Sequence, residues 1–217
     1  MNTQRQLSLA FYGDDFTGST DAMEVLTRAG LRTVLFLDPP SPALLKAFDH
    51  PDAVGLSGFT RSLPTGEMES VLQPALESLR KLNPRHVHYK VCSTFDSSPV
   101  IGSIGKAIEV GRSLFNRQAF VPVIAGAPSL GRFCVFGNLF ARMGTGGGPV
   151  YRLDRHPSAS RHPVTPAPDS DIRRYLDAQT DLRIGLVDIF TLSQKDADIR
   201  QALERETAEE GAEIVLL

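Results

Sequence analysis

Apolar positions in the first half of the chain follow two patterns in turn, short continuous runs and longer segments with helical spacing. Short runs, which predict strands, lie at residues 7–11, 32–37, 53–56, 86–91 and 120–124. Segments with apolar residues three and four positions apart, which predict helices, lie between them at about 16–30, 41–48, 64–82 and 104–115. Strands alternating with helices predict an α/β fold with a mainly parallel sheet and helices on both faces. Pro74 falls inside the third helical segment and predicts a kink or two helices in series.

The pattern changes between residues 126 and 168. This stretch is rich in Gly, Pro and Arg and has no clear period, so we expect a long irregular insert of the kind that usually serves function or an interface. Regular spacing returns with helices at 169–179 and about 192–210 and strands at 183–187 and 213–217. The last strand either closes the sheet or belongs to a longer protein, and we favour the second. We expect residues 1–217 to form a single domain.

Composition narrows the function classes. The 217 residues carry a net charge of −2, whereas a general nucleic-acid binder usually has a basic excess. No apolar run approaches the length of a membrane span. The polar start at residues 1–6 lacks the apolar segment of a signal peptide, which predicts a cytoplasmic protein. Two cysteines are too few for a disulfide framework.

The strongest candidate chemistry lies between the first predicted strand and helix. Ligands of open α/β sheets bind at the carboxyl ends of strands, and Asp14 and Asp15 stand at such an end. Adjacent carboxylates repel, and a helix amino terminus offsets this by only about 0.3–1 kcal/mol. Thr17 adds a hydroxyl, and Gly18 allows close approach to the backbone. One Asp alone would be a helix N-cap, but the pair followed by Thr-Gly favours a polar ligand site.

Two further strand ends carry polar groups. Arg61 follows the third strand, where a guanidinium suits a carboxylate or phosphate, although by itself it also fits a surface arginine. Lys90 ends the fourth strand and is followed by Ser93, Thr94 and Asp96. A cation, an acid and hydroxyls together match a small anion that bears several alcohols. We therefore expect these strand ends to form one site.

Sites for metals and nucleotides have weaker support. His86 and His88 share one face of a strand, but no third ligand has suitable spacing, so we expect no metal site. The pattern of a phosphate-binding loop fails around Lys106, because Val100 stands at its first glycine and Ala107 at its hydroxyl position. The segment 97–99, Ser-Ser-Pro, predicts a turn before a helix. The chain thus has features of a polar-substrate site without a nucleotide site.

The stretch 126–168 also contains a repeated Arg-His-Pro. Its members are Arg155 and His156, then Arg161 and His162. Either the pair binds an anion or forms an interface, or its side chains pin a loop by hydrogen bonds. The sequence leaves both interpretations open.

These motifs together resemble the four-carbon acid sugar kinase family, formerly a domain of unknown function. The segments that carry the resemblance are 13–18 (GDDFTG), 89–99 (YKVCSTFDSSP), 101–105 (IGSIG), 137–141 (GNLFA), 155–157 (RHP) and 161–166 (RHPVTP). The likeness runs from about residue 7 to 188. One departure is Ala167, where the family commonly has methionine.

The resemblance implies an ATP-dependent kinase that phosphorylates threonate, erythronate or a 3-oxo-tetronate. In that family an N-terminal domain binds the sugar acid, and a C-terminal domain binds ATP and Mg²⁺. This chain resembles the N-terminal, substrate-binding domain alone. The implied partners are the sugar acid and that C-terminal domain, without nucleic acid or membrane, and a homodimer stays open.

The resemblance also suggests roles for the candidate residues. Arg61 and Lys90 would pair with the substrate carboxylate. The acids and hydroxyls that would hold the substrate alcohols are Asp14, Asp15, Ser93, Thr94 and Asp96, with Thr17 and Gly18 as further donors. Asp15 or Asp96 is the candidate base, unless the base lies in the C-terminal domain. The alternatives are a non-catalytic sugar-acid-binding or regulatory module and a metal-dependent hydrolase or lyase.

Overall fold

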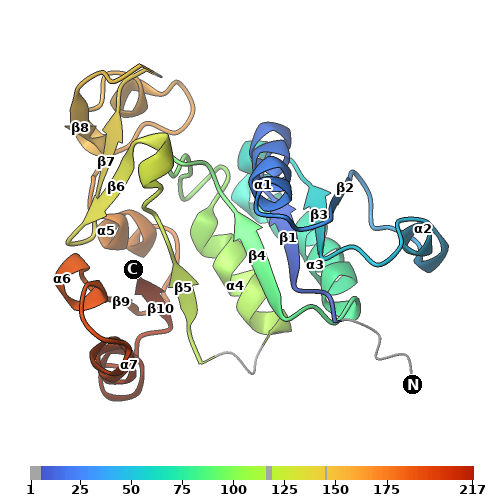
Figure 1. Cartoon of the computed structure of the whole chain (residues 1–217). Helices are drawn as coiled ribbons and strands as arrows, with labels where there is room; N and C mark the ends of the chain where they lie inside the picture. The colour runs from blue at the N-terminus through green and yellow to red at the C-terminus, as the bar shows by residue number, and fades with distance from the viewer. Residues whose placement is uncertain (1–5, 116–118, 145) are drawn as a thin grey trace. The chain divides into compact units, whose positions relative to one another are not determined.

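The structure, a computed structural model, describes residues 6–115, 119–144 and 146–217 (Figure 1). The chain divides into two compact units, residues 1–92 and 93–217, which we treat separately. Residues 1–5 of the polar start lie outside the described residues. Within the described ranges, no helix is both long enough and apolar enough to cross a bilayer.

The first unit is built on a four-stranded parallel sheet with strand order β2-β3-β1-β4. Its strands are β1 (Leu9–Gly13), β2 (Thr33–Phe36), β3 (Ala53–Ser57) and β4 (His86–Lys90). Its helices are α1 (Phe16–Arg28), α2 (Pro42–Lys46) and α3 (Thr65–Lys81). From β1 to β2 the chain moves toward one edge of the sheet, and from β3 to β4 it moves toward the other edge. Because such crossovers are right-handed, α1 and α3 lie on opposite faces of the sheet. The predicted α/β fold with a mainly parallel sheet is confirmed.

The strand register brings three carboxyl ends level. Gly13, at the end of β1, pairs with both Ser57 of β3 and Lys90 of β4. The Phe11 ring lies against Gly55, where an added Cβ would come within 2.2 Å of the ring. This packing holds β1 and β3 in a single register, because a slip by one residue would turn every side chain to the other face.

Helix α3 runs unbroken past Pro74. Pro74 lies on the exposed side of α3, and Leu72 and Leu76 lie buried on the other side. Burial of this apolar face, at about 1.5–3 kcal/mol per large side chain, offsets the hydrogen bond that the proline removes. The alternative of two helices in series is therefore wrong.

The second unit contains a smaller parallel sheet with β10 between β5 and β9. The strands are β5 (Val121–Val123), β9 (Ile184–Leu186) and β10 (Ile214–Leu216), with helices α4 (Ile104–Leu114), α5 (Ile172–Asp177), α6 (Ile189–Leu192) and α7 (Asp196–Glu204). Short 3₁₀ turns are η1 (Thr60–Ser62) in the first unit and η2 (Pro128–Leu130), η3 (Leu153–Arg155) and η4 (Ala159–Arg161) in the second; η5 (Arg205–Glu209) is a π-helical turn. The expectation of a single helix at 192–210 is therefore wrong, because this stretch contains the end of α6, then α7 and the π-helical turn η5.

The stretch 126–168 also contains regular structure. Strands β6 (Arg132–Val135), β7 (Asn138–Arg142) and β8 (Val150–Arg152) form an antiparallel sheet. Phe136 and Gly137, with φ of 51° and 81°, form the two-residue turn between β6 and β7. The expectation of an irregular insert is therefore wrong for residues 132–152, because these strands are short and mostly half-buried and leave little alternation in the sequence.

Two glycines of α4 give opposite predictions for the same substitution. A Cβ on Gly105 would lie 2.6 Å from the backbone oxygen of Gln179, whereas a Cβ on Gly111 would meet nothing within 4 Å. We expect Gly105→Ala to lower the free energy of unfolding by about 1–3 kcal/mol, because the backbone at Gln179 must shift to make room for the new Cβ. Gly111→Ala should raise it by up to about 1 kcal/mol through helix propensity. Urea denaturation of both variants checks the pair, and equal effects would contradict the packing described here.

Candidate functional site

The turn between β1 and α1 is fixed by its own side chains. Asp15 is the N-cap of α1, and its Oδ1 accepts a hydrogen bond from the Gly18 N–H at 2.8 Å. Ser19 Oγ donates to the Asp15 carbonyl at 2.6 Å. A Cβ on Gly13 would lie 1.9 Å from Ser19 Oγ, so this close approach requires glycine. The turn therefore places Asp14 and Asp15 at the carboxyl end of β1 with little freedom.

Backbone hydrogen bonds tie this turn to the ends of β3 and β4. The Asp14 N–H donates to the Lys90 carbonyl at 3.0 Å, and the Asp14 carbonyl accepts from the Arg61 N–H at 3.1 Å. The Gly58 N–H donates to the Gly13 carbonyl at 2.9 Å. The main chain thus sets the positions of Asp14, Arg61 and Lys90 relative to one another.

The Arg61 guanidinium lies between the two aspartates. Its Nε and Nη2 atoms donate to Asp14 Oδ2 and Oδ1 at 3.2 and 2.7 Å, and its Nη1 atom donates to Asp15 Oδ2 at 2.9 Å. The side chain of Asp14 is 4% exposed and that of Arg61 is 21% exposed. We call these residues the Asp14–Asp15–Arg61 cluster. Because its bidentate hydrogen bonds match an ionised carboxylate, Arg61 explains how two adjacent acids are tolerated here.

Burial and pairing change the acidity of the cluster. Burial raises the pKa of Asp14 above its usual range, and hydrogen bonds from Arg61 oppose the rise. Burial disfavours the charged form of Arg61 and so acts to lower its pKa. The hydrogen bonds and the electrostatic attraction to Asp14 outweigh this effect, so the pKa of the guanidinium is raised. Arg61 therefore keeps its charge at any ordinary pH, and Asp14 depends on Arg61 to stay ionised.

Lys90 supplies a second cation at the amino end of α1. Its Nζ donates to the Val91 carbonyl at 2.6 Å, the one hydrogen bond that the structure gives it among the described residues. A Cβ on Gly18 would lie 3.5 Å from Nζ. An ammonium has three donors, so two stay available beside the first turn of α1. Phe16 and Thr17 are exposed, and the N–H groups at a helix start have no carbonyl of their own helix to bind.

Buried hydroxyls lie near the cluster, and sequence patterns indicate little of them. Tyr12 and Tyr89 stack with ring centroids 5.8 Å apart, and Thr60 Oγ1 lies 2.9 Å from the Tyr89 hydroxyl. Burial raises the pKa of Tyr89, so this phenol stays protonated. The available signal was Tyr12 two positions before Asp14, which puts both side chains on one face of the strand.

The loop after β4 belongs to the second unit and is also held by side chains. Thr94 Oγ1 donates to Asp96 Oδ1 at 2.9 Å. Between them Phe95 is buried with φ of 61° and packs edge-on against Tyr175. Ser93 is half-buried. The structure thus brings Thr94 and Asp96 together, as it brings Asp14, Asp15, Gly18, Arg61 and Lys90 together in the first unit.

The next part of this loop is the turn that the sequence predicts at 97–99. Ser98 Oγ accepts a hydrogen bond from the Ile101 N–H at 3.0 Å. The Ser97 carbonyl accepts from the Tyr175 hydroxyl at 2.9 Å. Ser103 then caps α4 by accepting from the Lys106 N–H. The turn is therefore present, and the helix begins three residues after Ile101, at Ile104, inside the range 104–115 expected for it.

The repeated Arg-His-Pro pins its own loop through the histidines. His156 Nδ1 accepts from the N–H groups of Ser158 and Ala159, both at 3.2 Å, and His162 Nδ1 accepts from the Thr165 N–H at 3.0 Å. Burial lowers the pKa of His156, which keeps this acceptor unprotonated. These contacts favour the loop-pinning interpretation for His156 and His162. Their neighbours Arg155 and Arg161 are exposed.

Within the part of the chain that the structure describes, no cluster of side chains supports a metal site. No group of three His, Cys, Asp or Glu side chains there has the geometry to hold an ion. His88 lies in β4, and desolvation by the surrounding chain lowers its pKa.

The chain is similar to a known domain family and to two kinases. Residues 9–217 match the model of the sugar-binding N-terminal domain. A 3-oxo-isoapionate kinase from Paraburkholderia graminis is 49% identical over 195 residues, which are 89% of this chain and 40% of that protein. A 3-oxo-tetronate kinase from Pseudomonas savastanoi pv. phaseolicola is 31% identical over 209 residues, 96% of this chain and 46% of that protein.

The fold has relatives among solved structures as well. A crystal structure from Salmonella typhimurium LT2 superposes with a TM-score of 0.85 at 31% identity, over 97% of this chain and 48% of that one. The chain thus spans less than half the length of the relatives that it matches. Since the family match covers nearly the whole sequence, the chain belongs to the sugar-binding N-terminal domain of the four-carbon acid sugar kinase family.

Proposed function

We propose that this chain is the sugar-acid-binding part of an ATP-dependent kinase whose substrate is a short 3-oxo acid or hydroxy acid. The observation that carries the proposal is the Asp14–Asp15–Arg61 cluster with Lys90 at the level ends of β1, β3 and β4. Both relatives reported above are named as kinases of 3-oxo acids, a tetronate and an isoapionate. A 3-oxo acid of either kind offers a carboxylate at one end and a terminal hydroxyl at the other.

The carboxylate of the substrate is assigned first to Lys90. Its ammonium has two donors left beside the amino end of α1, where a helix favours negative charge. Three of the five N–H groups of Arg61 already bind Asp14 and Asp15, so Arg61 mainly orients the two acids. Its remaining donors and its charge add to the attraction for the anion. Thr17 and Gly18 line the same approach.

The hydroxyl end of the substrate is assigned to carboxylates. Asp14 and Asp15, held by Arg61, accept hydrogen bonds from the alcohols, and Asp15 is a candidate base for the reacting hydroxyl. The loop Ser93, Thr94 and Asp96, which begins only three positions after Lys90, is proposed to serve the same substrate, with Asp96 as the second candidate base.

The C-terminal domain of the longer relatives would supply ATP and Mg²⁺. Phosphoryl transfer relies on positioning and charge stabilisation more than on covalent chemistry by the protein. The part of the reaction assigned to this chain is therefore to bind the acid, orient its hydroxyl and accept a proton.

A kinase assay on two lengths of protein tests the proposal. We expect the full-length polypeptide to consume ATP with a 3-oxo-tetronate or 3-oxo-isoapionate, and residues 1–217 alone to consume none. Asp15→Asn in the full-length protein should lower kcat by about 10²–10⁴-fold if Asp15 is the base, with Asp96→Asn as the parallel variant. Rapid ATP consumption by residues 1–217 with a sugar acid would refute the proposal that phosphate transfer needs the C-terminal domain. Binding without phosphate transfer by the full-length protein would instead support a non-catalytic module.

A further inference from the structure

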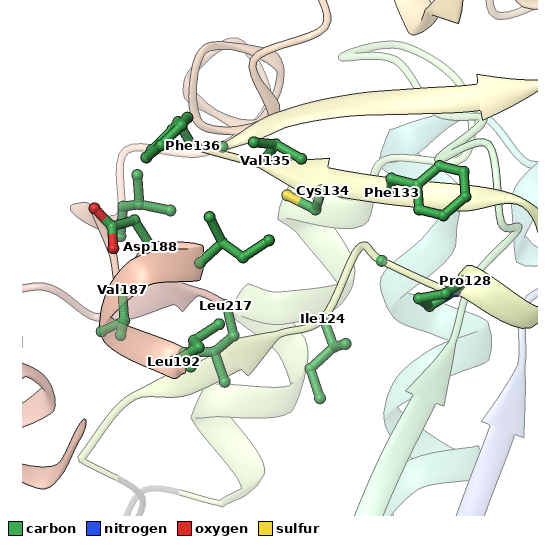
Figure 2. A pocket seen from close by; sticks show the side chains of 14 residues that line it. Ile124, Pro128, Phe133, Cys134, Val135, Phe136, Val187, Asp188, Leu192 and Leu217 are labelled. Atoms are coloured by element: carbon green, nitrogen blue, oxygen red, sulfur yellow. The ribbon is translucent and has the colours of Figure 1, made fainter. Parts of the chain in front are cut away.

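The second unit has an apolar cavity of about 450 Å³ at the carboxyl edge of its parallel sheet (Figure 2). Residues that directly follow the three strands form one wall, among them Ile124, Val187 and Leu217. The β6–β7 hairpin, α6 and the segment that contains Gly126 and Pro128 form most of the rest. Of the fourteen lining residues, Asp188 is the one that carries charge, and its carboxylate is used to cap α6.

Large apolar side chains at the cavity stay exposed to solvent. Ile124 is 71% exposed, and Phe190 of α6 is 67% exposed. Phe136, Ile189 and Leu192 are exposed as well, and the rings of Phe136 and Phe190 meet 5.2 Å apart. We call Ile124, Phe136, Ile189, Phe190 and Leu192 the apolar rim. Contiguous exposed apolar groups around a hollow are typical of a docking surface rather than of a free protein surface.

The backbone at Phe136 gives an independent sign that this surface has a role. Phe136 has φ of 51°, a conformation that disfavours bulky residues and that Asn or Gly adopts readily in such turns. A phenylalanine here costs conformational energy, and its ring gains little from burial because it stays exposed. Strain of this kind persists where a side chain serves an interaction.

We propose that the apolar rim and its cavity are the docking surface for the C-terminal domain of the longer protein. The proposal rests on the proposed function only in taking that domain from the relatives, of which this chain covers 40–46%. Leu217 lies in the cavity wall directly after β10, the central strand. In a longer protein, the residues after 217 therefore start at this cavity, and an apolar face among them is the occupant that the lining favours.

Cys134 gives a direct readout, because it lines the cavity and is a free thiol. Residues 1–217 and the full-length polypeptide are treated with N-ethylmaleimide, and peptide mass spectrometry follows Cys134 and Cys92 separately. We expect Cys134 to react at least tenfold more slowly in the full-length protein. This readout needs neither sugar acid nor ATP, so its failure is distinguishable from failure of the proposed function.

Two variants of the full-length protein locate the contact. Phe190→Asp should restore the reactivity of Cys134, whereas Val164→Asp, at an exposed apolar residue of the same unit outside the rim, should not. Phe136→Asn should also restore it, and in residues 1–217 this variant should keep or raise the melting temperature because it relieves the turn. Circular dichroism of each variant separates loss of docking from loss of folding.

Three results would overturn the proposal. The first is equal reactivity of Cys134 in both lengths of protein. The second is protection of Cys134 in the full-length protein that Phe190→Asp leaves intact in a folded variant. The third is a dimer of residues 1–217 by light scattering that protects Cys134 and that Phe190→Asp separates, which would assign the surface to a second copy of this chain.

Discussion

A sugar acid at about 100 times its dissociation constant is expected to raise the melting temperature of residues 1–217 by about 5–10 °C. Binding at that concentration stabilises the folded state by about 2.7 kcal/mol. A chain of this size gains about 2–4 °C per kcal/mol. D-erythronate and D- and L-threonate serve as stable probes beside the 3-oxo acids, which lose CO₂ readily. The ranking of the shifts also indicates which stereochemistry the site prefers.

The variants Lys90→Met and Asp14→Asn should remove half or more of this shift without unfolding the protein. A hydrogen bond to a charged group contributes about 1.5–3 kcal/mol, so either loss weakens binding by about 10–100-fold. Lys46→Met is the matched control, because Lys46 is an exposed lysine of the same unit on α2. A full shift retained in Lys90→Met, or a shift lost in Lys46→Met, would count against the assigned site.

The second large effect is on stability. Arg61→Met should lower the free energy of unfolding at pH 7 by about 2–4 kcal/mol, because it leaves the buried carboxylate of Asp14 without its partner. Asp14→Asn should cost less, about 1 kcal/mol, since Arg61 keeps Asp15 and the amide oxygen still accepts a hydrogen bond. The double variant should be more stable than Arg61→Met alone, because it removes the unpaired charge.

The cost of Arg61→Met should also depend on pH in a defined direction. Burial raises the folded-state pKa of Asp14 above the unfolded value, and loss of Arg61 raises it further. A carboxyl with a raised folded-state pKa favours folding below its unfolded pKa of about 3.9, and this contribution is lost as pH rises through the folded pKa. The deficit of Arg61→Met relative to wild type should therefore be small near pH 4 and grow toward neutral pH. Urea denaturation at both pH values measures it, and a deficit that is independent of pH would contradict this electrostatic account.

Much of the fold was predictable, because β1 to β4 and the helices between them follow strong apolar periodicities. The antiparallel strands β6 to β8 were not, because they have few buried positions and their hairpin uses a phenylalanine where a turn residue is expected. The division into two parallel sheets was also beyond the sequence. This division depends on which strands pair, and the sequence of a single strand does not indicate its neighbours in a sheet.

The candidate site was predictable in its members and less so in its arrangement. Asp14, Asp15 and Lys90 stand at strand ends, where topology alone brings them together. Arg61 was expected to face a ligand, yet it binds both aspartates from 46 and 47 positions away. No local pattern encodes this contact, because it follows from the register of β1 against β3 and from the turn η1 that carries Arg61.

The location of the bound sugar acid is the point on which the account depends most. Amide chemical shifts of residues 1–217, followed during a titration with D-erythronate or the best-binding probe, measure that location directly. We expect the largest changes at residues 13–19, 58–61 and 90–91, with none of comparable size in Lys90→Met. Changes centred on other parts of the chain, with these three segments unaffected at saturation, would contradict it.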